Sequence, residues 1–218
     1  MPVSHPHKTI FVHIPKTAGT SVEAVLGMHG DKKDIGVVPY FNQQLDHEHL
    51  YGGPLQHMTA QAIRTALNDE SAFQAYFKFA IVRNPWDRLV SALAWTGQKW
   101  ARGEELTGAD FERQVAAAHA LFVEAMTTGT VAKLPPFLYP QCLYVLDPEQ
   151  RMLVDFVGKY ENLSADWQVI CARLGVDLEL PLRMKSHHRH YRDYYSAQTR
   201  KMVAEMYAPD LSLFHYEF

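Results

Sequence analysis

The sequence predicts an α/β fold in which a mostly parallel β-sheet is flanked by helices. Short runs of β-branched and aromatic residues alternate with segments whose apolar residues recur at helical spacing. A polar turn connects such a run to a helix at two separate places in the chain. With 218 residues and no linker-like stretch, the chain has the length of one domain, which we expect to span residues 1–218.

The first strand–turn–helix unit lies near the N-terminus. The run TIFVHI, residues 9–14, is typical of a buried strand, and Pro15 ends it. A turn follows over residues 16–20, and a helix is predicted from Ser21 until Gly27 and Gly30. Residues 31–58 are rich in Gly, Pro, His and Asp and show little periodicity, so we expect loops there.

A second unit of the same kind follows. After a predicted helix over residues 60–67 and a polar break, the run FKFAIV, residues 77–82, predicts another buried strand. Asn84 and Pro85 end that strand, and Pro85 is well suited to the first turn of a helix. Ligands of such sheets bind beyond the carboxyl ends of the strands, where both turns would lie.

The remaining elements are predicted from shorter patterns. Helices are expected over residues 109–128, 169–174 and 199–206, and short strands over residues 144–146 and 153–157. Residues 207–218 are expected to form a tail.

Composition excludes several classes of protein. The net charge of −3 gives no reason to expect a nucleic-acid or membrane partner. The N-terminus has neither a spanning apolar segment nor a signal-peptide core. Cys142 and Cys171 are far apart and lack a CxxC spacing, which favours free buried thiols in a reducing compartment. A cytoplasmic location is therefore expected.

The first turn has the composition of a phosphate-binding loop. In HIPKTAGTS, residues 13–21, a glycine permits close backbone approach, the helix start offers N–H groups, and a lysine adds positive charge. The fold would then be P-loop-like, although Lys16 precedes Gly19, unlike in a Walker A motif. The alternative is a polar turn with an ordinary helix cap. The candidate ligand-binding residues here are Lys16, Thr17, Ala18, Gly19, Thr20 and Ser21.

Two segments resemble those of a known family. FVHIPKTAGTSVE resembles the 5′-phosphosulfate loop of sulfotransferases that use 3′-phosphoadenosine 5′-phosphosulfate (PAPS), particularly the carbohydrate O-sulfotransferase branch. FAIVRNPWDRLVSAL, residues 79–93, resembles the family's 3′-phosphate motif, which implies that Arg83 and Ser91 bind that phosphate. A planar guanidinium at a strand end suits such a contact, and the alternative is a structural ion pair between Arg83 and Asp87.

The resemblance continues more weakly along the chain. Residues 155–167 and 207–218 resemble segments of the same branch. The stretch KSHHRHYRDYY, residues 185–195, falls where such enzymes place a basic loop over the nucleotide, which makes Lys185, Ser186 and Arg189 candidates. The alternative there is a solvated basic turn.

The resemblance also implies the catalytic groups. Lys16 would stabilise the leaving phosphate oxygen and the transferring sulfonate. The family's base is a His or a Glu between the two motifs, and we select His57, just before a predicted helix, because imidazole suits proton abstraction near neutrality. The competing residues are Glu23 on the first helix and a cluster of His47, Glu48 and His49. That cluster and His187, His188 and His190 lack a complete metal-ligand set, so we expect no metal.

The predicted function is therefore transfer of a sulfuryl group from PAPS to a hydroxyl of a carbohydrate or other small-molecule acceptor. A P-loop-type nucleotide kinase is one alternative, although such an enzyme requires a Walker lysine, which this loop lacks. A non-catalytic glycan-binding protein on the same fold is another, because a fold does not establish an activity. The sequence does not determine the oligomeric state or the acceptor.

Overall fold

The computed structural model describes residues 2–28, 57–96, 106–181 and 189–218. The chain divides into two compact units, Met1–Val82 with Leu143–Arg183 and Arg83–Cys142 with Met184–Phe218. Each unit is assembled from two separated stretches of sequence. The assignment of residues 1–218 to one domain stays a prediction.

The first unit is built around a four-stranded sheet. Its strands are β1 (Val3–Ser4), β2 (Thr9–Val12), β3 (Phe77–Val82) and β4 (Phe156–Lys159), in the spatial order β1-β2-β3-β4. β2 pairs with β3 and β3 with β4 in parallel, whereas β1 pairs with β2 antiparallel. The predicted α/β class with a mostly parallel sheet is confirmed.

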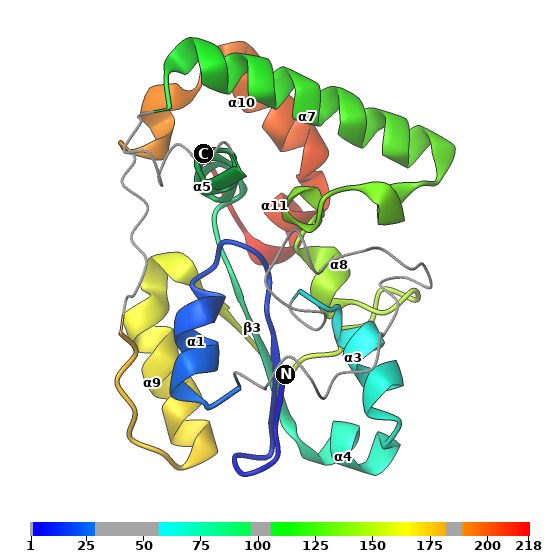
Figure 1. Ribbon diagram of the computed structural model, residues 1–218, viewed down its shortest axis with the longest axis vertical. Coiled ribbons are helices and arrows are strands. Elements are labelled where there is room, and N and C mark those ends of the chain that lie inside the picture. Colours follow the sequence, from blue (N-terminus) through cyan, green and yellow to red (C-terminus); the bar gives the residue numbers. More distant parts are fainter. Residues whose placement is uncertain (1, 29–56, 97–105, 182–188) are drawn as a thin grey trace. The chain divides into compact units, whose positions relative to one another are not determined.

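Helices cover both faces of this sheet (Figure 1). On one side lie α1 (Gly19–Val25) and α9 (Leu163–Leu174), and on the other lie α3 (Ala60–Leu67) and α4 (Glu70–Ala75). Alternate residues of a strand point to the same face of the sheet, and the residues that point toward α1 and α9 are apolar. Its buried cluster comprises Phe11, Val22, Leu26, Met28, Phe79, Ile81, Leu163, Trp167, Ile170 and Cys171.

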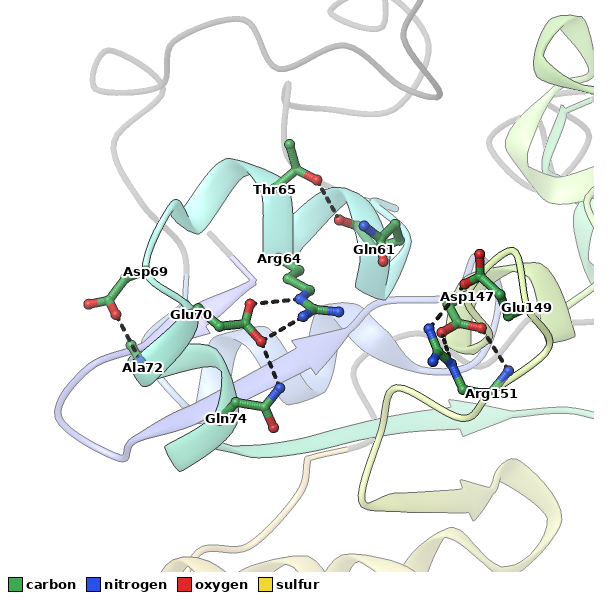
Figure 2. Close-up of polar contacts among 10 residues, drawn as sticks. All are labelled: Gln61, Arg64, Thr65, Asp69, Glu70, Ala72, Gln74, Asp147, Glu149 and Arg151. Atoms are coloured by element: carbon green, nitrogen blue, oxygen red, sulfur yellow. Dashed lines mark hydrogen bonds and ion pairs between the residues drawn. The ribbon is translucent and has the colours of Figure 1, made fainter.

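Polar contacts fix the outer parts of this unit (Figure 2). Arg64 of α3 donates to both carboxylate oxygens of Glu70, the first residue of α4, at 2.7 and 2.6 Å. After the short helix α8 (Cys142–Val145), a tight turn is closed by Arg151, which donates from Nε to Asp147 at 2.7 Å. These contacts tie neighbouring segments together at the surface.

The second unit is mainly helical. Its α-helices are α5 (Pro85–Thr96), α7 (Gly108–Thr128), α10 (Ala197–Met206) and α11 (Ala208–Phe214), and α7 packs along α10 (Figure 1). Short 3₁₀ turns in the second unit are η1 (Val131–Lys133), η2 (Pro136–Leu138) and η4 (Tyr191–Tyr194), and η3 (Tyr160–Asn162) lies in the first unit. No helix in the described residues has the length and apolar character needed to cross a bilayer.

Several predicted elements differ from the structure. The strand predicted over residues 144–146 is wrong, because α8 covers Tyr144 and Leu146 makes only an isolated bridge to Met152. The strand predicted over residues 153–157 begins later, at Phe156, since the Asp155 carboxylate accepts the Lys78 N–H at 2.8 Å just before the ladder starts.

Besides α8, two further α-helices of the described residues lie where the sequence predicted none. α4 occupies the polar break before β3, and α11 occupies the expected tail. α4 buries only Phe73, and α11 is seven residues long, so neither has an extended apolar repeat. Both cysteines are buried thiols, as expected.

Candidate functional site

The loop after β2 has the backbone geometry of an anion-binding turn. Lys16 and Ala18 both have φ of 70°, and Thr17 between them does not belong to the positive-φ residues. Such alternation turns successive N–H groups toward one concave side, which is how backbone nests hold anions. The Thr17 hydroxyl donates to the Ile14 carbonyl at 2.8 Å and is buried, so it braces the loop from within.

Helix α1 begins directly from this loop. Gly19 is its first residue, and no side chain caps the preceding Ala18. The helix start therefore depends on the loop backbone rather than on a Ser, Thr or Asp cap. Thr20 is exposed and Ser21 is buried in the first turn.

A buried His–Glu pair supports the loop. His13, the residue directly after Val12, donates from Nδ1 to Glu23 Oε1 at 2.8 Å, and both side chains are buried. A Cβ built on Gly19 would lie 2.0 Å from His13 Cδ2, so the imidazole ring occupies the space that a side chain would need. Glycine is thus required at the start of α1 for a steric reason.

His57, the predicted base, contacts this same loop. Its Nδ1 lies 3.0 Å from the His13 carbonyl oxygen, and the two imidazole rings are T-shaped with centroids 4.4 Å apart. A carbonyl only accepts hydrogen bonds, so Nδ1 carries the proton and the lone pair of the neutral ring is on Nε2. The ring is buried, and its backbone has an uncommon φ of 66°.

The start of α3 holds His57 in place. Thr59, two residues later, caps α3 by accepting the Ala62 N–H through its hydroxyl at 3.1 Å. The cap and the helix fix the chain just after His57, and they thereby help to hold its imidazole against the loop.

The second predicted corner follows β3 directly. Arg83 comes after the last strand residue, and the carbonyl of Asn84 accepts from Arg88 at 2.8 Å in the first turn of α5. The Arg83 Nε donates to Asp87 at 2.8 Å, so the ion pair considered as an alternative is present. Ser91 is buried on the same helix, eight residues after Arg83.

The predicted residues are thus distributed between the two units. Lys16, the loop to Ser21 and His57 belong to the first, and Arg83 and Ser91 belong to the second. Since β2 and β3 are neighbouring parallel strands, the loop and Arg83 follow strand ends at the same edge of the sheet.

Some predicted residues cannot be placed. Lys185 and Ser186 lie outside the described residues, as do His47, Glu48, His49, His187 and His188. Arg189 is exposed, and its guanidinium lies 5.3 Å from the Tyr194 ring centroid. Within the described ranges no group of three or more His, Cys, Asp or Glu side chains is arranged to hold a metal ion.

Sequence reasoning missed the role of His13. The residue lies inside the recognised loop motif, but its partner Glu23 is ten residues away and was considered only as a competing base. The pairing depends on the sharp reversal at Lys16 and Ala18, and neither residue type favours positive φ.

The family model and two named relatives that match this chain are all sulfotransferases. The model of the sulfotransferase family matches residues 1–117, more than half of the chain, and this range includes both corners and His57. Carbohydrate sulfotransferase 10 of Danio rerio is 36% identical over 89 residues, and its Xenopus laevis counterpart is 34% identical over 93. These matches cover 39% and 41% of the chain but only 22% and 24% of the relatives.

An uncharacterized protein of Archaeoglobus fulgidus is similar over more of its own length. It is 25% identical over 129 residues, which is 59% of this chain and 92% of that protein. No solved structure gives a significant match.

Proposed function

Because the chain belongs to the sulfotransferase family, we propose that it transfers a sulfuryl group from PAPS to a hydroxyl of a carbohydrate or other small-molecule acceptor. The observation that carries the proposal is the family match, which spans the loop after β2, His57 and the corner after β3. Membership of the family supports sulfuryl transfer in general. The identities of the donor, the general base and the acceptor are further parts of this proposal.

In this proposal the two corners bind opposite ends of one nucleotide. The 5′-phosphosulfate is held by the loop after β2 and the start of α1, through Lys16, Thr17, Ala18, Gly19, Thr20 and Ser21. The alternating φ values of this loop and the absence of a side chain at Gly19 suit it to bind an anion. Arg83 and Ser91 hold the 3′-phosphate. The parallel pairing of β2 and β3 supports the sharing, since both corners follow the same sheet edge. Lys185 and Ser186 are further proposed nucleotide contacts.

The proposed reaction is an in-line displacement. The acceptor oxygen attacks sulfur and forms a new S–O bond, while the bond from sulfur to the bridging oxygen breaks and its electron pair stays on the 5′-phosphate. Lys16 stabilises the negative charge that develops on that oxygen. No metal ion is part of this scheme.

His57 is the proposed general base that takes the acceptor proton. Its donation from Nδ1 to the His13 carbonyl supports this role, because it leaves Nε2 as the basic nitrogen of the ring. Its contact with the loop that would hold the sulfuryl donor also supports it. Glu23, the competing residue on α1, has its carboxylate engaged by His13, which favours a supporting role.

The acceptor class comes from the relatives. Both vertebrate relatives are named carbohydrate sulfotransferases, which supports a glycan or another hydroxyl-bearing small molecule as acceptor. We also propose that all 218 residues form one sulfotransferase domain and that the protein is cytoplasmic, a location that its two buried thiols favour.

Ligand selectivity tests the proposal against a nucleotide kinase. Calorimetric titration in EDTA should show tight binding of adenosine 3′,5′-bisphosphate and weak binding of ATP. Tighter binding of ATP that requires Mg²⁺ would instead support a kinase.

Turnover tests it against a non-catalytic protein. With PAPS and a panel of sugars, release of adenosine 3′,5′-bisphosphate should fall ~100-fold or more in His57→Ala and in Lys16→Ala. His57→Ala should still bind the nucleotide. Lys8→Ala is a matched control because Lys8 also has positive φ, and His119→Ala, on α7, controls for the loss of a histidine. Normal turnover by His57→Ala would refute the assignment of the base.

A further inference from the structure

The main chain of Arg83 is held by a side chain from a distant part of the sequence. The Arg83 N–H donates to Gln141 Oε1 at 2.9 Å, and Gln141 Nε2 donates to the Arg83 carbonyl at 2.8 Å. The amide therefore pairs with both backbone groups of one residue, as a neighbouring strand would. Because the N–H only donates and the carbonyl only accepts, one orientation of the amide satisfies both bonds.

Gln141 is in turn fixed by a buried carboxylate on α11. Asp210 accepts the backbone N–H of Gln141 at 2.7 Å on Oδ2 and that of Cys142 at 2.8 Å on Oδ1. Gln141 Nε2 also lies 3.4 Å from Oδ2. Gln141 and Asp210 both have no exposed surface, so every one of these groups depends on its protein partners.

A buried arginine balances the charge of this network. Burial raises the pKa of Asp210, while the Arg88 guanidinium and the two backbone donors act to lower it. Arg88 is 1% exposed, lies on α5 and donates to the Tyr139 carbonyl at 2.6 Å. A buried charged network of this kind costs desolvation energy and is rigid when its members are paired.

This network contacts Arg83, whose guanidinium must point in the correct direction to bind the proposed nucleotide. A guanidinium binds a phosphate through two parallel bonds only when its fork is correctly aimed. Gln141 fixes the Arg83 backbone, and Asp87 fixes Nε at the other end of the side chain. Both constraints together leave little freedom for the orientation of the fork.

We propose that Gln141, oriented by Asp210, is a positioning residue that aims Arg83 and thereby sets the preference for a 3′-phosphorylated nucleotide. The inference rests on the proposed function, in which Arg83 binds the 3′-phosphate. Gln141 acts through Arg83 and needs no contact with the nucleotide itself.

The test compares two dissociation constants, for adenosine 3′,5′-bisphosphate and for AMP, which lacks the 3′-phosphate. Their ratio reports the contribution of the 3′-phosphate alone. Gln141→Met removes both amide bonds to the Arg83 backbone and should reduce the ratio about tenfold or more, since a misaimed Arg83 loses a hydrogen bond to the charged 3′-phosphate and such bonds are worth that much. AMP affinity should change little. Gln198→Met, at an exposed position on α10 of the same unit, is the matched control and should keep the wild-type ratio.

A second variant keeps the proposal testable if Gln141→Met fails to fold, as judged by circular dichroism. Gln141→Glu retains the acceptor for the Arg83 N–H, but its carboxylate cannot donate to the Arg83 carbonyl and lies close to the Asp210 carboxylate, so the ratio should fall as well. In an Arg83→Ala background the same change should leave the ratio unaltered, because the residue acts through Arg83.

The possible outcomes test the proposed function and the positioning role of Gln141 separately. A wild-type protein that binds AMP and the bisphosphate equally would refute the proposed function. A wild-type protein that prefers the bisphosphate, together with Gln141 variants that keep the full ratio or lose AMP affinity equally, would overturn the positioning role.

Discussion

His13 joins three segments of the first unit through one residue. Its ring packs against Gly19, its Nδ1 donates to Glu23, and its main-chain carbonyl accepts from His57. A change at any of these positions can therefore reach the others through direct contact. This is the physical reason to expect that the loop geometry and the orientation of the proposed base depend on each other.

Asp147 shows how a single carboxylate links stability to pH. Burial acts to raise the pKa of Asp147, but hydrogen bonds from the Arg151 backbone and guanidinium outweigh it and the pKa is lowered. A carboxyl with a depressed folded pKa stabilises the protein above its unfolded pKa of about 3.9. That stabilisation is lost as pH falls through the folded value.

Arg151→Met should consequently make the protein less stable at neutral pH and its stability less dependent on pH in the acid range. The variant keeps the backbone N–H bond to Asp147 but loses the guanidinium bonds shown in Figure 2, so the pKa of Asp147 rises toward its ordinary value. Urea denaturation should show a stability difference from wild type at pH 7 that disappears below about pH 3.

Lys201→Met provides the control for this experiment. It removes a surface cation whose Nζ lies 3.8 Å from Glu205, with both side chains largely exposed, and such pairs contribute little. An Arg151→Met difference that is the same at pH 7 and pH 3 would contradict the role of the Asp147 charge.

At the scale of residues, sequence reasoning located most chemistry-bearing groups but not their supports. Lys16, Arg83 and His57 could be selected because motifs and strand ends place them. Gln141 could not, because its partners Arg83 and Asp210 are 58 and 69 residues away. A glutamine in a loop carries no periodicity that would reveal a buried amide.

At the scale of elements, the loop and α1 form a unit whose geometry depends on one steric contact. Gly19 is not in the positive-φ region, so a side chain there meets no backbone penalty. The obstacle is the His13 ring, which lies within 2.1 Å of a built Cβ through both Cδ2 and Nε2. To make room, the ring must leave its position and with it the bond to Glu23.

Gly19→Ala should therefore destabilise the protein by about 2–4 kcal/mol, combining overpacking with the loss of the buried hydrogen bond between His13 and Glu23. It should also weaken binding of adenosine 3′,5′-bisphosphate. Thermal and urea unfolding measure the first effect and calorimetry the second.

Gly108→Ala is the matched comparison. Gly108 is the first residue of α7, nothing lies within 4 Å of a built Cβ, and alanine favours helix, so stability should be unchanged or slightly higher. Equal stability of Gly19→Ala and the wild type would show that the loop tolerates displacement of His13.

Elements with strong apolar patterns were predicted most accurately. The strand at Phe77–Val82 and the helix at Ala60–Leu67 have the expected bounds because their apolar residues have a clear period. The short apolar run around Tyr144 suits a strand or a buried helix equally, and the tertiary context made it helical. Short helices such as α4 depend on caps like Asp69 rather than on a periodic face.

At the scale of the whole molecule, the order of the strands carries the functional account. Alternating strands and helices predicted parallel pairing, and the pairing of β2 with β3 confirms it. The interleaving of the two units was not predicted, because the boundary at Val82 falls at the end of a strand, without a change in composition. The proposed function depends on this order, because it assigns one nucleotide to the corners that follow β2 and β3.

A crystal structure of the protein with adenosine 3′,5′-bisphosphate tests that claim most directly. We expect one nucleotide whose 5′-phosphate contacts Lys16 and the loop to Ser21 and whose 3′-phosphate contacts Arg83 and Ser91. A complex in which Lys16 and Arg83 contact no common nucleotide would contradict it.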